Sequence, residues 1–90
     1  MTTITFKKAC KIVQKATACI IDGNALSYPV VNEDFNGNDC IEVNWQGENG
    51  MHENTFTSEA TYSIDDNGCL VIDEDGSQYF LQFLKLTKVK

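Results

Sequence analysis

Two short polar turns near the C-terminal end of the chain constrain the fold more than any other feature of the sequence. Residues 65–68 (Asp-Asp-Asn-Gly) and 73–76 (Asp-Glu-Asp-Gly) each end in glycine and lie between short apolar runs. Asn and Gly tolerate the positive φ that tight hairpin turns require. The pattern therefore predicts antiparallel strands over residues 69–72 and 78–86, each entered through a hairpin turn.

The preceding segments also have the character of strands. Ile41, Val43 and Trp45 alternate with more polar neighbours, which predicts a strand with one apolar face. Residues 18–22 and 25–31 are predicted to pair around a turn at 23–24, with Pro29 at an edge because it has no N–H to donate. We expect a polar loop at 32–39 and a turn at 46–50. Alternation over 56–64 predicts one long strand.

The N-terminal segment has the periodicity of an amphipathic helix. Apolar residues recur at spacings of three and four between positions 6 and 16, and four lysines lie on the opposite side. Thr5 or Thr3 is the expected N-cap, because its hydroxyl can accept from a free backbone N–H. The sequence thus predicts a single α+β domain over residues 1–90, with one N-terminal helix packed on an antiparallel meander of four to six strands.

The last predicted strand is apolar on both sides. One face carries Tyr79, Leu81 and Phe83, and the other carries Phe80, Leu84 and Leu86. A strand that is apolar on both faces is normally covered on both faces. One helix covers one face, so the other is expected to meet a second sheet layer or a second subunit. A homodimer is therefore one of two alternatives.

Charge is segregated along the chain. All 13 acidic residues lie between Ala16 and Leu84, and all seven lysines lie outside that stretch; there is no arginine. The net charge of −6 thus divides into −13 for the middle and +7 for the ends. A field of one sign indicates a partner of the opposite sign, reached by electrostatic steering.

The motifs of common catalytic and metal sites are missing from the sequence. His52 is the single histidine and is expected in an exposed loop or at a strand edge. The four cysteines are spaced too widely for the paired ligands of a zinc site, and we interpret them as buried free thiols of a cytoplasmic protein. The acidic turn at 73–76 has its glycine too early for a calcium loop. We therefore expect no enzyme activity, cofactor or metal.

The acidic middle also narrows the choice of partner. Direct binding to DNA or RNA is disfavoured, because affinity for nucleic acid comes mainly from lysine and arginine. A membrane partner is not expected either, because no apolar run approaches the length of a membrane span. A basic nucleic-acid-binding protein fits better. The carboxylates expected to contact it are Glu33, Asp34, Asp39, Glu42, Glu59, Asp65, Asp66, Asp73, Glu74 and Asp75.

The acidic hairpins over residues 62–68 and 70–79 are similar to those of one general class of proteins. In size, acidic character and α+β organisation, the chain resembles the small anti-CRISPR and anti-restriction inhibitors of phages and mobile elements, which imitate nucleic acid. That resemblance implies a protein of the host cytoplasm that blocks the DNA- or RNA-binding surface of a defence complex. The alternatives are a self-associating structural or adaptor protein and a protein that sequesters a small anionic ligand.

Overall fold

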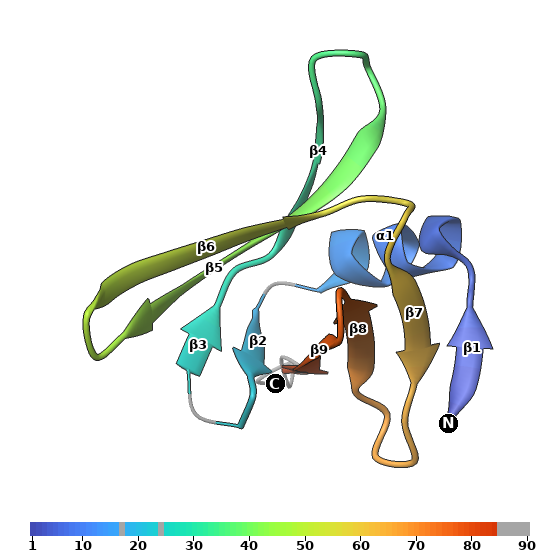
Figure 1. Ribbon diagram of the computed structural model, residues 1–90. Coiled ribbons are helices and arrows are strands. Elements are labelled where there is room, and N and C mark those ends of the chain that lie inside the picture. Colours follow the sequence, from blue (N-terminus) through green and yellow to red (C-terminus); the bar gives the residue numbers. More distant parts are fainter. Residues whose placement is uncertain (17, 24, 85–90) are drawn as a thin grey trace, which may run out of the picture.

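The computed structural model describes residues 1–16, 18–23 and 25–84, and it has an α+β fold with one helix and nine strands in those residues (Figure 1). The elements are β1 (Thr2–Ile4), α1 (Phe6–Lys15), β2 (Cys19–Ile21), β3 (Ala25–Ser27), β4 (Val30–Glu33), β5 (Asp39–Gly47), β6 (Gly50–Phe56), β7 (Thr61–Ile64), β8 (Leu70–Glu74) and β9 (Ser77–Phe83). The α+β class is confirmed, whereas the prediction of four to six strands was too low.

The strands form one curled antiparallel sheet with the order β1-β7-β8-β9-β2-β3-β5-β4, and β6 pairs with β5. The order departs from a simple meander, because β9 returns to pair with β2 and β1 pairs with β7. The helix packs against β4, β5 and β7, and so bridges parts of the sheet that are distant in its strand order.

The helix begins as predicted. The hydroxyl of Thr5 accepts a hydrogen bond from the backbone N–H of Lys8 at 3.1 Å, which satisfies one of the free donors of the first turn. Ala9, Cys10 and Val13 are buried against the sheet. The four lysines of the helix are exposed on its other side. This arrangement buries the apolar face of α1 in the core and leaves its charge in water.

The core lies between α1 and the concave face of the sheet. Its largest fully buried side chains include Tyr62, Phe56, Ile21, Ile41 and Leu70. These residues come from β2, β5, β6, β7 and β8, so the core draws on most of the sheet.

Several predicted boundaries were wrong. The predicted long strand over 56–64 is broken, because β6 ends at Phe56 and β7 starts at Thr61. Residues 50–56, for which the sequence predicted no strand before position 56, form β6, which pairs with residues 41–47 of β5. The predicted loop at 32–39 contains the end of β4, and the turn after β8 is limited to Asp75 and Gly76, which both have positive φ.

Pro29 separates β3 from β4 instead of lying within one strand. Both β3 and β4 pair with the same edge of β5, so the segment 25–31 runs alongside β5 with an interruption at Pro29. The predicted last strand ends at Phe83 in the structure, and Leu86 lies outside the described residues.

Candidate partner-binding surface

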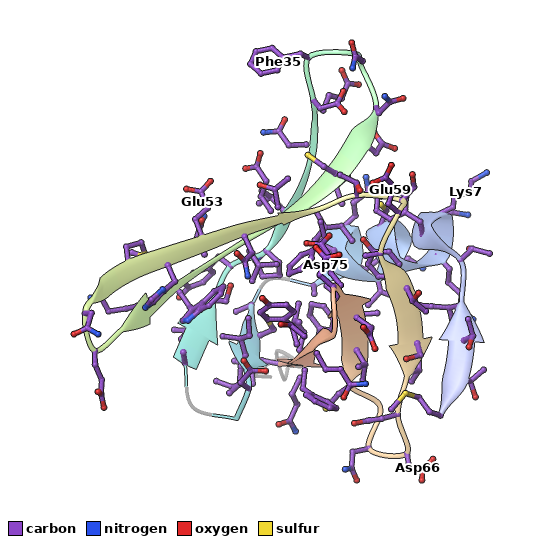
Figure 2. The ribbon with its side chains drawn as sticks, viewed as in Figure 1. Lys7, Phe35, Glu53, Glu59, Asp66 and Asp75 are labelled. Atoms are coloured by element: carbon purple, nitrogen blue, oxygen red, sulfur yellow. The ribbon has the colours of Figure 1, made fainter. Side chains whose placement is uncertain are left out.

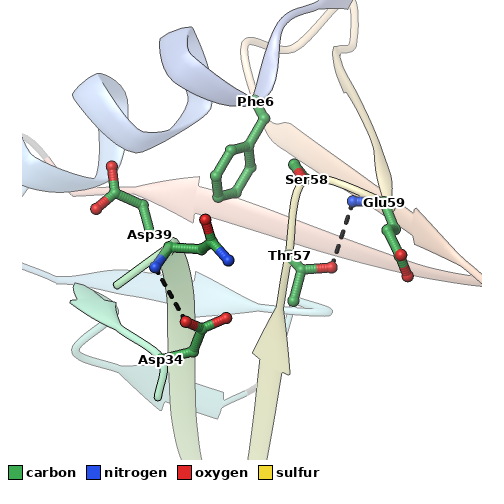
Figure 3. Close-up of a pocket in the computed structure, with 7 residues that line it drawn as sticks. Phe6, Asp34, Asp39, Thr57, Ser58 and Glu59 are labelled. Atoms are coloured by element: carbon green, nitrogen blue, oxygen red, sulfur yellow. Dashed lines mark hydrogen bonds between the residues drawn. The ribbon is translucent and has the colours of Figure 1, made fainter. Parts of the chain in front are cut away.

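Five of the ten predicted carboxylates meet in two grooves that share Asp34. The larger groove has a volume of about 490 Å³ and lies between the start of α1, the β4–β5 hairpin and the loop after β6 (Figure 3). The smaller groove, of about 350 Å³, runs along the hairpin itself. The carboxylates that line them are Glu33, Asp34, Asp39, Glu42 and Glu59. None of the five forms an ion pair with a described cation.

The tip of the β4–β5 hairpin is held by one of these carboxylates. Oδ1 of Asp34 accepts hydrogen bonds from the backbone N–H groups of Asn36 and Asn38, at 2.8 and 3.0 Å. The Asp34 N–H donates to the carbonyl of Asn38, and its carbonyl accepts from the N–H of Gly37. Gly37 supplies the positive φ that the turn needs. The bonds from Asn38 and then Asn36 hold the pKa of Asp34 below its ordinary value.

Removing this carboxylate should loosen the tip. We expect Asp34→Ala to increase amide hydrogen exchange at Asn36 and Asn38 about tenfold at neutral pH, because both backbone N–H groups lose the charged oxygen that accepts their hydrogen bonds. Asp66→Ala is the control, since no backbone amide among the described residues donates to Asp66. Unchanged exchange at both positions in Asp34→Ala would show that the carboxylate does not order the tip.

The lowered pKa of Asp34 also makes the order of the hairpin tip depend on pH. A carboxyl group with a depressed native pKa stabilises the folded loop above its ordinary value of 3.8, and that contribution is lost as the pH falls through the native value. After correction for intrinsic rates, protection at Asn36 and Asn38 should therefore decline only below pH 3.8.

Like charges face each other on the hairpin. Glu33 of β4 lies directly opposite Asp39 of β5, an arrangement that destabilises an antiparallel pair. Both side chains are exposed. This pair therefore contributes repulsion rather than stability to the hairpin.

Glu59 lines the larger groove from the loop that follows β6. The Glu59 N–H donates to the hydroxyl of Thr57 at 3.3 Å (Figure 3). The hydroxyl of Tyr62 donates to the carbonyl of Thr57 at 2.6 Å. Tyr62 is itself buried and packs against Phe6 of the helix, with ring centroids 5.3 Å apart. The core thereby fixes the loop that presents Glu59.

Phe35 projects from the tip of the hairpin into solvent. Its relative exposure is 109%, the highest of the exposed large apolar side chains, and Figure 2 shows its ring pointing away from the molecule. The sequence analysis did not select this residue. The signal that could have found it is a single aromatic residue inside an otherwise polar turn, flanked by Glu33 and Asp34 on one side and Asn36 on the other.

The other predicted carboxylates divide between the two ends of β8. The β7–β8 turn carries Asp65 and Asp66 at the end away from the helix, whereas Asp75 lies at the end near α1 (Figure 2). Asp73 and Glu74 belong to β8 and precede that second turn. The two acidic turns therefore cannot contact the same small area of a partner. Asp65 also accepts backbone bonds from Asn67 and Cys69, so its carboxylate has a structural role.

The cysteines carry protonated thiols at neutral pH. Burial raises the pKa of Cys19 to about 11, and the neighbouring Ser27 hydroxyl opposes that shift. Burial is also the main cause of the raised pKa of Cys10, Cys40 and Cys69. All four are free, as the sequence predicted, but only Cys10, Cys19 and Cys40 are buried, and Cys69 is partly exposed. Nucleophilic chemistry needs the thiolate form, so this environment does not favour it.

The described side chains include no cluster of three or more His, Cys, Asp or Glu arranged to hold a metal ion. In the same part of the chain, no helix has both the length and the apolar character that crossing a membrane requires. His52 is exposed on β6, an edge strand, as predicted, and it stacks on Trp45 with ring centroids 5.5 Å apart.

The geometry defines an α+β protein in which five carboxylates line two neighbouring grooves at the β4–β5 hairpin. No protein-family model, curated protein or solved structure matches this chain.

Proposed function

We propose that this protein is an acidic inhibitor that covers the positively charged nucleic-acid-binding surface of another protein, in the manner of anti-CRISPR or anti-restriction inhibitors. The observation that carries the proposal is the set of five carboxylates around two grooves that share Asp34, free of described ion pairs. Such a surface attracts lysine and arginine residues at long range and steers association.

Phe35 adds an exposed apolar side chain to this surface, at the hairpin tip beside the smaller groove. A few aromatic or arginine anchors usually carry most of the binding energy of an interface, and Phe35 is the aromatic residue exposed among these carboxylates. The hydrogen bonds that the Asp34 carboxylate accepts from the backbone of Asn36 and Asn38 hold the tip that presents Phe35, which lowers the entropy lost on binding. The corresponding partner surface is an apolar pocket bordered by basic side chains.

The sequestration of a small anionic ligand has less support. An anionic ligand needs positive counter-charges, and neither of the acidic grooves is lined by lysine. The lysines of α1 are exposed on the helix surface instead.

Capture from a bacterial lysate tests the proposal. At ~0.1 M salt the tagged protein should recover a nucleic-acid-binding protein, which should be released at ~0.5 M salt because the Debye length falls from about 10 to about 4 Å. Heparin, a polyanion, should release it as well, since it competes for the same basic surface. A partner that remains bound in ~0.5 M salt and in heparin would contradict the proposal.

A further inference from the structure

A row of exposed apolar side chains lies on β3 and β4, on the outer face of the sheet beside β5 and β6 (Figure 1). Leu26, Tyr28 and Val30 are spaced two residues apart and are 48%, 60% and 48% exposed. These three residues are referred to below as the apolar stripe. Leu26 and Tyr28 line a groove of about 350 Å³ together with Met51 of β6, which is 68% exposed.

The alternation of side chains places the apolar stripe on the face opposite to the core. Ser27 is fully buried, and Val31 packs against the core cluster, so both point to the inner face. The neighbouring side chains of Leu26, Tyr28 and Val30 therefore point to the outer face. Since each of them is about half exposed or more, the described residues leave this face open.

The apolar stripe adjoins the smaller acidic groove. Val30 lies directly opposite Glu42 of β5, and Glu42 lines that groove. The next residue of β5 on the same face is Asn44, about 7 Å along the strand, and it lines the apolar groove. The acidic groove and the apolar groove therefore follow one another along the outer face of β5.

The charges of this face define the chemistry of its occupant. Glu42 and Glu53 are the charged residues on the outer side of β5 and β6. Every lysine that the structure describes lies on α1, which packs on the inner face. A nucleic acid, an anionic membrane or a second copy of this acidic chain would bring further negative charge toward these two carboxylates. A basic protein with exposed apolar side chains complements the face in both respects.

The acidic grooves alone are also too small for a stable interface. Seven residues line the larger groove and six line the smaller one, whereas a stable interface takes roughly 20–30 residues from each side. The apolar stripe and Met51 extend the smaller groove along the same face. Tyrosine and methionine are enriched in the cores of interfaces, so this extension has the composition that the acidic grooves lack.

We propose that the basic partner of the acidic grooves also docks on the apolar stripe. Apolar side chains of the partner pack against Tyr28 and Met51, and its basic side chains lie over Glu42 and Glu53. This inference rests on the proposed function and adds the kind of surface that the partner has, a basic region continued by an apolar ridge. The carboxylates speed association, whereas the stripe slows dissociation.

Binding kinetics of uncharged variants test the proposal. The basic partner captured from the lysate is immobilised at ~0.1 M salt, and the full chain, Tyr28→Ser and Tyr28→Phe are passed over it. Tyr28→Ser should dissociate at least about tenfold faster, because an aromatic anchor is lost. Its association rate should stay within about twofold, since its charge is unchanged. Tyr28→Phe keeps the aromatic ring and should match the unmodified chain within about twofold. The side chain is exposed, so both variants should fold.

The alternative occupants give different results. Unchanged kinetics in Tyr28→Ser, or equal losses in Tyr28→Ser and Tyr28→Phe, would overturn this inference and leave the proposed function standing. The inference is also overturned if Tyr28→Ser loses only a protein that heparin does not release, or if it dissociates a dimer of the free chain in sedimentation velocity. Failure to capture any partner that heparin releases would overturn the proposed function, and this inference with it.

Discussion

Charge reversal at Asp39 and Glu59 is expected to weaken binding to the captured basic partner at least about a hundredfold. Both carboxylates are exposed in the larger acidic groove, and neither caps a described turn. A contact between unit charges at 4 Å contributes about 1 kcal/mol in water and more where water is excluded. The double variant Asp39→Lys/Glu59→Lys replaces two attractions by two repulsions. A hundredfold loss corresponds to about 2.7 kcal/mol and is measurable by titration calorimetry at ~0.1 M salt.

A matched control separates the surface from the net charge. Glu48→Lys/Asp66→Lys also takes the net charge from −6 to −2, but at the β5–β6 and β7–β8 turns. Neither residue lines an acidic groove. We expect this variant to lose less than about fivefold in affinity, through weaker steering alone. Equal losses in the two variants would mean that overall charge, rather than this surface, drives binding.

Phe56→Ala is expected to lower the free energy of unfolding by about 3–5 kcal/mol, the usual loss when a buried phenylalanine is truncated. Phe56 is 1% exposed at the end of β6, lies opposite Ile41 and meets Tyr79 edge-on at 5.1 Å. The total free energy of unfolding of a small domain is about 5–15 kcal/mol, so this variant loses a large share of its stability. Urea unfolding followed by tryptophan fluorescence measures the change.

Phe35→Ala is the control for that experiment. The same side chain is removed, but from a fully exposed position, so the free energy of unfolding should change by no more than about 0.5 kcal/mol. A loss below about 1 kcal/mol for Phe56→Ala would contradict the core described here.

Features set by neighbouring residues could be predicted from the sequence. Thr5 caps the helix as expected, the buried face of α1 is the predicted one, and the turn at 65–68 forms the β7–β8 hairpin. A cap, a helix period and a tight turn each depend on a few residues in sequence. These signals therefore remain visible without knowledge of the rest of the fold.

Features set by distant pairing could not be predicted in the same way. β6 has a largely polar sequence and is a strand because β5 pairs with it; β1 has only three residues and depends on β7. The grouping of Glu59 with Asp39 likewise follows from the position of the loop after β6 beside the hairpin. The sequence predicted both carboxylates as partner contacts, but it predicted Asp66 as a contact too. The structure places Asp66 in the β7–β8 turn, at the end of the molecule away from Glu59 (Figure 2).

Displacement of nucleic acid tests the central claim most directly. The captured partner is first bound to a fluorescent DNA or RNA duplex at ~0.1 M salt, and the protein is then added while anisotropy is followed. The account predicts that the protein releases the duplex, and that Asp39→Lys/Glu59→Lys does not at the same concentration. A stable ternary complex of partner, duplex and protein would contradict it, because the acidic surface would then bind somewhere other than the nucleic-acid site.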